Sequence, residues 1–185
     1  MTWAKHVVAE EVISAEKIAA RVKELGAQIT RDYAPHGDQL VCAAILRGAA
    51  IFMADLAREI HLPMEIDYLS VSSYGKATKS TGVVRIIKDL SMAIEGKHLL
   101  LVEDVVDTGI TWSYLRRILE SRGPASIRMC TLLDKPSARK IECSVDYVVF
   151  TIPNRFVIGY GLDWKERYRK LPYVAEARAH VEGEH

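Results

Sequence analysis

Three carboxylates and two hydroxyls lie within nine residues near the middle of the chain. Glu103 and Asp104 are adjacent, Asp107 follows them, and Thr108 and Thr111 flank a glycine. Carboxylates can accept hydrogen bonds from sugar hydroxyls, and free backbone N–H groups at the start of a helix can bind a phosphate. The pattern therefore predicts a site for a phosphorylated sugar.

This acidic cluster also has a purely structural interpretation, because acidic residues are common at helix starts. Three carboxylates within five residues, directly after the apolar run 99–102, are harder to explain in that way. The carboxyl ends of strands are where ligands bind in open α/β sheets. We therefore interpret the cluster as functional.

The elements that position the cluster follow from the hydrophobic periodicity. Ser14 is a typical N-cap, and apolar residues at helical spacing after it predict a helix over residues 15–33. Two more helices are expected over residues 49–60 and 112–119. The expected strands, with a polar loop over residues 72–82, are residues 40–46, 64–71, 83–88, 99–102, 127–133 and 147–151.

Strands that alternate with helices in this order predict an α/β fold class, with a mainly parallel twisted sheet flanked by helices. The chain has 185 residues, with no internal repeat and no linker-like segment. This length allows one domain with a sizeable core and is short for two. We therefore expect a single domain.

Composition excludes several classes of partner. A net charge of +1 gives no field to attract nucleic acid or an anionic membrane, so neither is expected. No apolar stretch approaches the ~20 residues of a membrane span, and the first residues do not resemble a signal peptide. Cys42, Cys130 and Cys143 are scattered and odd in number, which favours free thiols and a cytoplasmic location.

The segment 99–111 resembles the phosphoribosyl pyrophosphate motif of the type I phosphoribosyltransferases. The resemblance implies that Glu103 and Asp104 bind the ribose hydroxyls and the Mg²⁺ that accompanies the sugar. Asp107 is the implied general base, and a side chain at Gly109 would crowd the phosphate. The residues expected to bind the 5′-phosphate are Asp107, Thr108, Gly109, Ile110 and Thr111.

Further motifs are similar to the 6-oxopurine branch of this family, the hypoxanthine-guanine phosphoribosyltransferases. Residues 45–48 imply a cis peptide bond before Arg47, which turns backbone N–H groups toward pyrophosphate. The polar stretch 72–82 implies a loop that folds over the active site and excludes water. The residues that the resemblance assigns to pyrophosphate are Arg47, Gly48, Ser73, Tyr74 and Arg169.

The purine site is implied by residues 133–136 and 156–163. In the family, the residue matching Lys135 donates to the purine 6-oxygen, and the one matching Phe156 stacks on the base. The backbone of Val157 would bind the edge of the base. Asp163 would lie near the 2-position and help to place a second Mg²⁺. The implied metal ligands are therefore Glu103, Asp104 and Asp163.

The resemblance covers about residues 12–174 and implies an enzyme. It would transfer 5-phosphoribose from phosphoribosyl pyrophosphate to N9 of hypoxanthine or guanine, with Mg²⁺ as cofactor. The type I fold would form one domain over residues 1–185, with a core of about 38–150 and a hood from about 1–15 and 151–185. A homodimer or homotetramer is expected.

Three alternatives remain open at this stage. The first is an enzyme of the same fold that acts on xanthine or another base. The second is a non-catalytic regulator that senses phosphoribosyl pyrophosphate. Such a regulator needs an added DNA-binding domain or a basic face, for which the chain has neither room nor charge. The third, a structural α/β domain, leaves the acidic cluster without a purpose.

Overall fold

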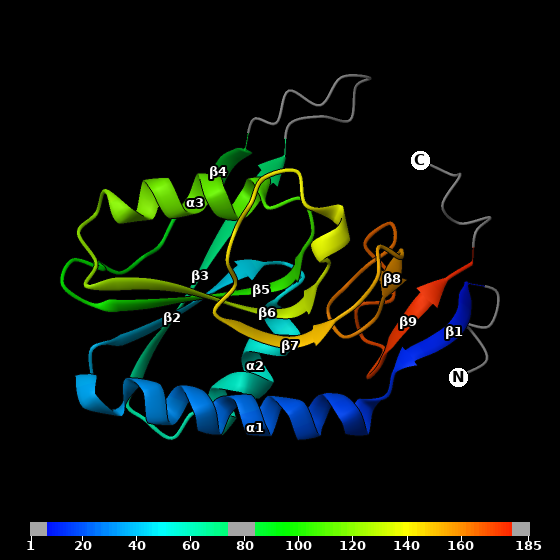
Figure 1. The fold of residues 1–185 in the computed structure, drawn as a ribbon, viewed down its shortest axis with the longest axis horizontal. Coiled ribbons are helices and arrows are strands. Elements are labelled where there is room, and N and C mark those ends of the chain that lie inside the picture. The colour runs from blue at the N-terminus through cyan, green and yellow to red at the C-terminus, as the bar shows by residue number, and fades with distance from the viewer. Residues whose placement is uncertain (1–6, 74–83, 179–185) are drawn as a thin grey trace.

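The computed structural model describes residues 7–73 and 84–178, in which the strands form two sheets (Figure 1). The larger sheet has the strand order β4-β3-β2-β5-β6-β7, and the smaller has the order β1-β9-β8. Tyr74 and most of the expected loop lie outside the described residues.

The six-stranded sheet is mainly parallel, as the alternation of strands and helices predicts. β2 pairs in parallel with β3 and β5, and β5–β6 and β6–β7 are also parallel, whereas β4 runs antiparallel to β3. Its strands are β2 (Leu40–Leu46), β3 (Met64–Ser73), β4 (Val84–Lys88), β5 (His98–Val106), β6 (Ser126–Asp134) and β7 (Tyr147–Thr151).

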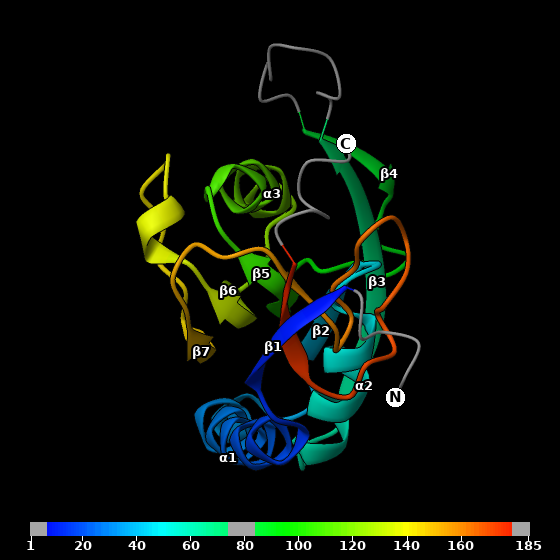
Figure 2. The same ribbon diagram turned by 90° about the vertical axis from the view of Figure 1, so that its right-hand side faces the viewer.

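Helices cover both faces of this sheet. Figure 2 shows α1 (Ala15–Tyr33) and α2 (Ala50–Glu59) on one face and α3 (Ile110–Glu120) on the other. Alternate residues of β2 enter two separate hydrophobic clusters, one toward α1 and α2 and one toward α3. A strand buried on both faces must be apolar throughout, which explains why β2 reads as a continuous apolar run.

Local signals set the helix starts and short turns. Ser14 caps α1, because its hydroxyl accepts a hydrogen bond from the backbone N–H of Lys17 at 3.3 Å. Short 3₁₀ segments follow α1 and β6, namely η2 (Ala34–His36) and η3 (Pro136–Ala138). Within the described ranges, no helix is both long enough and apolar enough to cross a membrane.

The small sheet joins segments from the two ends of the chain. β1 (Val8–Ile13) and β8 (Val157–Ile158) both pair antiparallel with β9 (Val174–Ala177). In Figure 1 this sheet lies beyond the ends of β5 and β6, on the right. These strands fall in the ranges expected for the hood, and the division of the chain into core and hood stays a prediction.

Two strands continue at least two residues past their predicted carboxyl ends. β5 does not end at Val102, because its pairing with β6 continues to Val106 opposite Asp134. Glu103 and Asp104 therefore lie within the strand and not after it. β3 continues to Ser73, which pairs with Val84 of β4, so the expected loop begins at least two residues later than predicted.

Candidate active site

The carboxyl end of β5 carries two acidic side chains, one of which lacks a hydrogen-bond donor. The Oε2 atom of Glu103 is buried and has no hydrogen-bond partner among the described residues. Burial, together with the charges of Asp104 and Asp107, raises the pKa of Glu103 well above its usual range. Burial also raises the pKa of Asp104 to about 6, although the Val105 N–H and Arg169 act against it. This end of the strand therefore favours cations and hydroxyl donors.

The loop between β2 and α2 packs directly on this acidic end. The peptide bond between Leu46 and Arg47 is cis, as the resemblance implies. A Cβ atom at Gly48 would lie 1.6 Å from Oδ2 of Asp104, and one at Gly161 would lie 2.0 Å from the Gly48 carbonyl oxygen. Only glycine permits these approaches. Three distant segments therefore meet at Gly48.

The turn after β5 leads into α3, whose N-cap residue has no side chain that could accept hydrogen bonds from the first N–H groups of the helix. Gly109 is the N-cap residue and has a φ of +78°, which favours glycine. A Cβ atom there would lie 2.6 Å from the carbonyl oxygen of Ile141. Close packing against residues 141–143 is therefore a second reason why position 109 requires glycine, in addition to the expected contact with phosphate. A cavity of about 20 Å³ beside the turn is lined partly by Asp107 and Thr111.

Two predicted phosphate residues flank this glycine. The side-chain oxygen of Thr108 accepts a long hydrogen bond from the Ile110 N–H at 3.4 Å. The backbone N–H of Thr108 donates to the carboxylate of Asp107. The predicted phosphate residues therefore form the turn after β5 and the first residues of α3.

Lys135 lies at the end of β6, next to the acidic cluster. Its side chain is buried, and its ammonium group donates to the carbonyl oxygen of Arg155 at 2.6 Å. Burial lowers the pKa of Lys135, while the carboxylates of Asp107 and Asp104 act in the opposite direction. Phe156 is half-buried and follows Arg155 directly. Of the predicted purine residues, the structure therefore places Lys135 beside the acidic cluster and Phe156 in the segment that Lys135 contacts.

The two arginines predicted to bind pyrophosphate contact the same carboxylate. Glu166 accepts from Arg47 at 3.1 Å and from Arg169 at 2.9 Å. Arg169 also pairs with Asp163 at 2.7 Å and donates to the carbonyl oxygen of Gly161 at 2.8 Å. Its Nε atom is buried without a partner among the described residues. Ser73 ends β3, and Tyr74 lies outside the described ranges.

The predicted metal ligands fit Mg²⁺ only as part of a larger coordination shell. Across residues 7–73 and 84–178, no group of three or more His, Cys, Asp or Glu side chains could hold a metal ion alone. Glu103, Asp104 and Asp163 therefore do not form a protein-only centre. Mg²⁺ usually keeps several waters and binds one or two carboxylates together with substrate oxygens. The unpartnered Oε2 of Glu103 is a suitable oxygen for such a shell.

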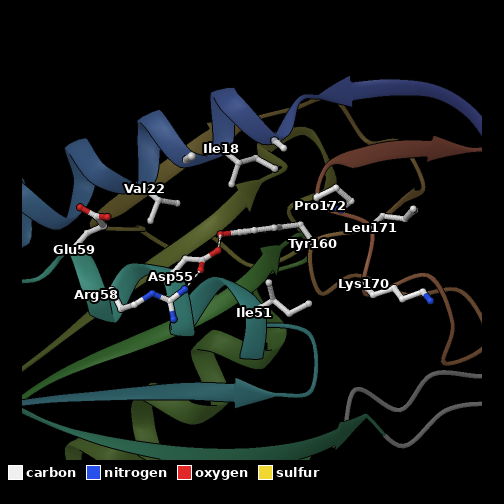
Figure 3. A pocket seen from close by; sticks show the side chains of 12 residues that line it. Ile18, Val22, Ile51, Asp55, Arg58, Glu59, Tyr160, Lys170, Leu171 and Pro172 are labelled. Carbon is white, nitrogen blue, oxygen red and sulfur yellow. Dashed lines mark hydrogen bonds and ion pairs between the residues drawn. The ribbon is translucent and has the colours of Figure 1, made fainter. Parts of the chain in front are cut away.

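A second cavity, of about 490 Å³, lies away from the acidic cluster between α1, α2 and residues 160–172 (Figure 3). None of the predicted site residues is among the described residues that line it. The Tyr160 hydroxyl donates to Asp55 at 2.6 Å, and Asp55 also pairs with Arg58. Because Gly161 contacts Gly48, Tyr160 anchors this loop of the site on α2.

Sequence reasoning missed two charged residues of the site, Glu166 and Arg139. Glu166 lies between the two predicted pyrophosphate arginines. Arg139 donates to the carbonyl oxygen of Asp107 at 2.6 Å. Both follow a predicted site residue by three or four positions in a polar stretch, where charged residues are usually solvated. No signal in a single sequence separates them from ordinary surface residues.

Known proteins resemble this chain over most of its length. The family model of the phosphoribosyl transferase domain matches residues 8–165. The chain is 49% identical over 172 residues to the hypoxanthine phosphoribosyltransferase of Salmonella typhimurium, and the match covers 93% of this chain and 96% of that protein. It is 52% identical over 167 residues to the hypoxanthine-guanine phosphoribosyltransferase of Mycobacterium bovis, which covers 88% of this chain and 83% of that protein.

The structural comparison agrees with the expected fold class. A crystal structure of a hypoxanthine phosphoribosyltransferase from Staphylococcus aureus matches with a TM-score of 0.92 and 44% identity. The match covers 98% of this chain and 97% of that chain. The family match, the curated relatives and the fold agree, and the chain belongs to the phosphoribosyltransferase family.

Proposed function

We propose that this protein transfers 5-phosphoribose from phosphoribosyl pyrophosphate to N9 of hypoxanthine, guanine or both, as a step of purine salvage. The observation that carries the proposal is the acidic end of β5 beside a helix start with glycine at its N-cap, with the buried cation of Lys135 next to it. Relatives that are 49% and 52% identical to this chain are named hypoxanthine phosphoribosyltransferase and hypoxanthine-guanine phosphoribosyltransferase.

The sugar and its phosphate fit the carboxyl end of β5 and the turn after it. Glu103 and Asp104 accept hydrogen bonds from the ribose hydroxyls, which supplies the donors that Glu103 lacks. The backbone of residues 107–111 and the hydroxyls of Thr108 and Thr111 bind the 5′-phosphate at the start of α3. Glu103, Asp104 and Asp163 would hold Mg²⁺ together with waters and substrate oxygens, and the bound ion would supply positive charge near the leaving pyrophosphate.

Catalysis is mainly the placement of charge around an oxocarbenium-like sugar. The bond from C1 of the ribose to pyrophosphate breaks as N9 of the base attacks C1. Asp107 receives the N7 proton of the purine. The departing pyrophosphate is bound by Arg47, Gly48, Ser73, Tyr74 and Arg169. The forked guanidinium of Arg169 suits a phosphate group.

Base selection rests on the residues near Lys135. Its ammonium group donates to a 6-oxo group but is mismatched with the 6-amino group of adenine, which has no acceptor there. Phe156 stacks on the base, and the backbone of Val157 binds the edge of the base. The Lys135 ammonium donates to the carbonyl oxygen of Arg155, the residue before Phe156. This hydrogen bond holds the ammonium group near the segment that carries Phe156.

The direct test is release of pyrophosphate from phosphoribosyl pyrophosphate and Mg²⁺ with a panel of free bases. We expect turnover with hypoxanthine or guanine and at most weak turnover with adenine. Preferential use of xanthine or a pyrimidine would replace the proposed substrate. Tight binding of phosphoribosyl pyrophosphate without turnover on any base would favour a sensor over an enzyme.

Substitution of Asp107 tests the catalytic assignment. Asp107→Asn should lower kcat about 10²–10⁴-fold, because general-base assistance is lost. The Kd for nucleoside monophosphate should change little, since the backbone contacts to phosphate remain. Asp89→Asn is the matched control, because Asp89 pairs with Arg122 away from the site and should leave kcat unchanged. Near-wild-type turnover of Asp107→Asn would contradict the assignment.

The protein is proposed to act in the cytoplasm as a homodimer or homotetramer. All three cysteines are free thiols, which suits a reducing compartment. Ile66 on β3 and Ile87 on β4 are 40% and 62% exposed, and association would cover such apolar side chains. Light scattering coupled to gel filtration distinguishes these states from a monomer.

A further inference from the structure

Arg139 lies at the centre of a group of backbone contacts behind the proposed active site. It follows η3 and points back under the end of β5, where its Nη1 atom donates to the carbonyl oxygens of Val106 and Asp107, each at 2.6 Å. The same atom lies 3.5 Å from the carbonyl oxygen of Lys135. Its Nη2 atom pairs with the carboxylate of Asp134. The Arg139 and Asp134 side chains are only 16% and 14% exposed.

The three carbonyl groups belong to segments with different proposed roles. Val106 ends β5, Asp107 carries the proposed general base, and Lys135 carries the proposed base-recognition ammonium. One guanidinium therefore joins the part of the site that moves a proton to the part that reads the purine. The adjacent backbone strengthens this link, because the N–H groups of Lys140 and Ile141 both donate to the Thr108 carbonyl oxygen, at 3.0 and 3.1 Å.

A guanidinium is suited to this task and an ammonium is not. Arginine presents five N–H donors in a rigid planar fork, so it can bind Asp134 on one side and carbonyl oxygens on the other. Lysine offers one compact charge on a flexible stem. Asp134 holds the fork in place and neutralises it, which keeps a buried charge from being unpaired.

We propose that Arg139, oriented by Asp134, is a positioning residue that fixes the Asp107 turn relative to Lys135. The inference rests on the proposed function, because the two residues that it aligns have their roles from that proposal. Arg139 touches neither sugar nor base in this account and acts only through the backbone of residues 106–108 and Lys135.

The test compares Arg139→Met and Arg139→Lys with a control from β6, Arg128→Met. Arg128 donates to the Tyr147 hydroxyl at 2.8 Å and lies over the Tyr33 ring, with no contact to the proposed site. All three variants should unfold at lower temperature than the wild type. Kinetics are measured well below the unfolding temperature of each variant.

Arg139→Met should lower kcat/KM for hypoxanthine about 100-fold, the effect expected when a reacting group moves by about 1 Å. Its preference for hypoxanthine over adenine should fall about 10-fold, because Lys135 is no longer fixed. The kcat/KM of Arg139→Lys should lie between those of Arg139→Met and the wild type. In a further variant, Arg139→Ala, added guanidinium ion should partly restore kcat/KM. Arg128→Met should keep wild-type kinetics and wild-type base preference.

Hydrogen exchange gives a readout that does not depend on activity. The amides of Lys135, Lys140 and Ile141, which donate to the carbonyl oxygens of Val106 and Thr108, should exchange faster in Arg139→Met and not in Arg128→Met. Wild-type turnover with unchanged exchange and base preference in Arg139→Met would overturn the inference. A wild-type protein that turns over no base would overturn the proposed function, and the exchange comparison would still decide the positioning role.

Discussion

Two carboxylates of the same sheet have opposite environments. Asp67 on β3 is 5% exposed, and its oxygens accept from the backbone N–H groups of Tyr68, Ser91 and Met92 at 2.6–3.0 Å. The ammonium group of Lys88 lies 3.6 Å away. Burial alone would raise the pKa of Asp67, but these donors outweigh burial and lower the pKa.

Glu103 on β5 lacks such donors. Its buried Oε2 has no partner among the described residues, and its acidic neighbours add to the effect of burial in raising its pKa. A carboxylate that stabilises a fold brings its own donors, because an unpartnered buried charge is costly. A carboxylate that binds a ligand must leave its oxygens available. The contrast supports a structural role for Asp67 and the proposed ligand-binding role for Glu103.

The largest effect in free energy should come from breaking the satisfied member of the pair. Asp67→Asn removes the charge and turns an amide N–H₂ group toward backbone donors, so we expect a loss of about 3–5 kcal/mol in the free energy of unfolding. Urea denaturation measures the loss. Enzymatic kcat/KM in the folded state should stay at the wild-type value. A stable Asp67→Asn protein would remove the structural half of the contrast.

The functional member should respond in the opposite way. Glu103→Gln should lower kcat/KM for phosphoribosyl pyrophosphate about 10–100-fold, the value of one or two hydrogen bonds to a charged group. Its unfolding temperature above neutral pH should rise, since an unpartnered buried charge is removed. Glu65→Gln is the matched control, because Glu65 pairs with Lys97 at the surface and has no proposed role in binding or catalysis. An unfolding temperature that falls with Glu103→Gln would contradict the contrast.

The pH dependence of stability should separate the two kinds of carboxylate in protein freed of metal with EDTA. The folded-state pKa of Asp104 is about 6, above its ordinary 3.8, so the folded protein binds more protons between these values. The free energy of unfolding therefore falls as the pH rises through this range. Asp104→Asn should gain on the order of 2–3 kcal/mol over the wild type between about pH 4 and about pH 7.

Asp67 should give the opposite slope, because its folded-state pKa is lowered. Its stabilising contribution is present above its ordinary pKa and is lost as the pH falls through the folded-state value. The difference in the free energy of unfolding between wild type and Asp67→Asn should therefore become smaller at acidic pH. Parallel curves for Asp67→Asn and Asp104→Asn would show that the two carboxylates do not differ as argued.

The sequence predicts the elements of the larger sheet well, because their signals are local. The apolar run of β2 and the capped, periodic α1 need no knowledge of distant contacts. β1, β8 and β9 were not predicted as strands. β8 and β9 have only two and four residues, and three of the six residues of β1 are exposed, so β1 contains no apolar run. Their pairing depends on segments from opposite ends of the chain. The extra residues of β5 likewise depend on pairing with β6.

The candidate site divides in the same way. Glu103, Asp104 and Asp107 stand close together in the sequence, so their grouping is visible there. Gly161 approaches Gly48, and Arg139 donates hydrogen bonds to the backbone at the end of β5. Both contacts join segments that are far apart in the sequence, so they cannot be derived from the spacing of residues along the chain. The family resemblance supplied the roles of Lys135 and Arg169, which composition and periodicity alone could not.

The smallest expected effect concerns a third carboxylate, Glu166, which sharpens the contrast from the cationic side. Its side chain is 56% exposed and pairs with Arg47 and Arg169, the arginines proposed to bind pyrophosphate. An incoming pyrophosphate must replace these pairs. Exposed ion pairs contribute about 0.2–1 kcal/mol, so Glu166→Gln should lower the KM for pyrophosphate in the reverse reaction about 2–5-fold.

The KM for hypoxanthine should not change in this variant, since Glu166 contacts neither Lys135 nor Phe156 in the interactions described. A raised KM for pyrophosphate would mean that Glu166 orients Arg169 for the ligand and does not compete with it. Arg169 would then resemble Asp67, whose partners are fixed, more than Glu103, whose oxygen is left available. The direction of this small shift therefore decides whether the cationic side of the site follows the same rule as the acidic side.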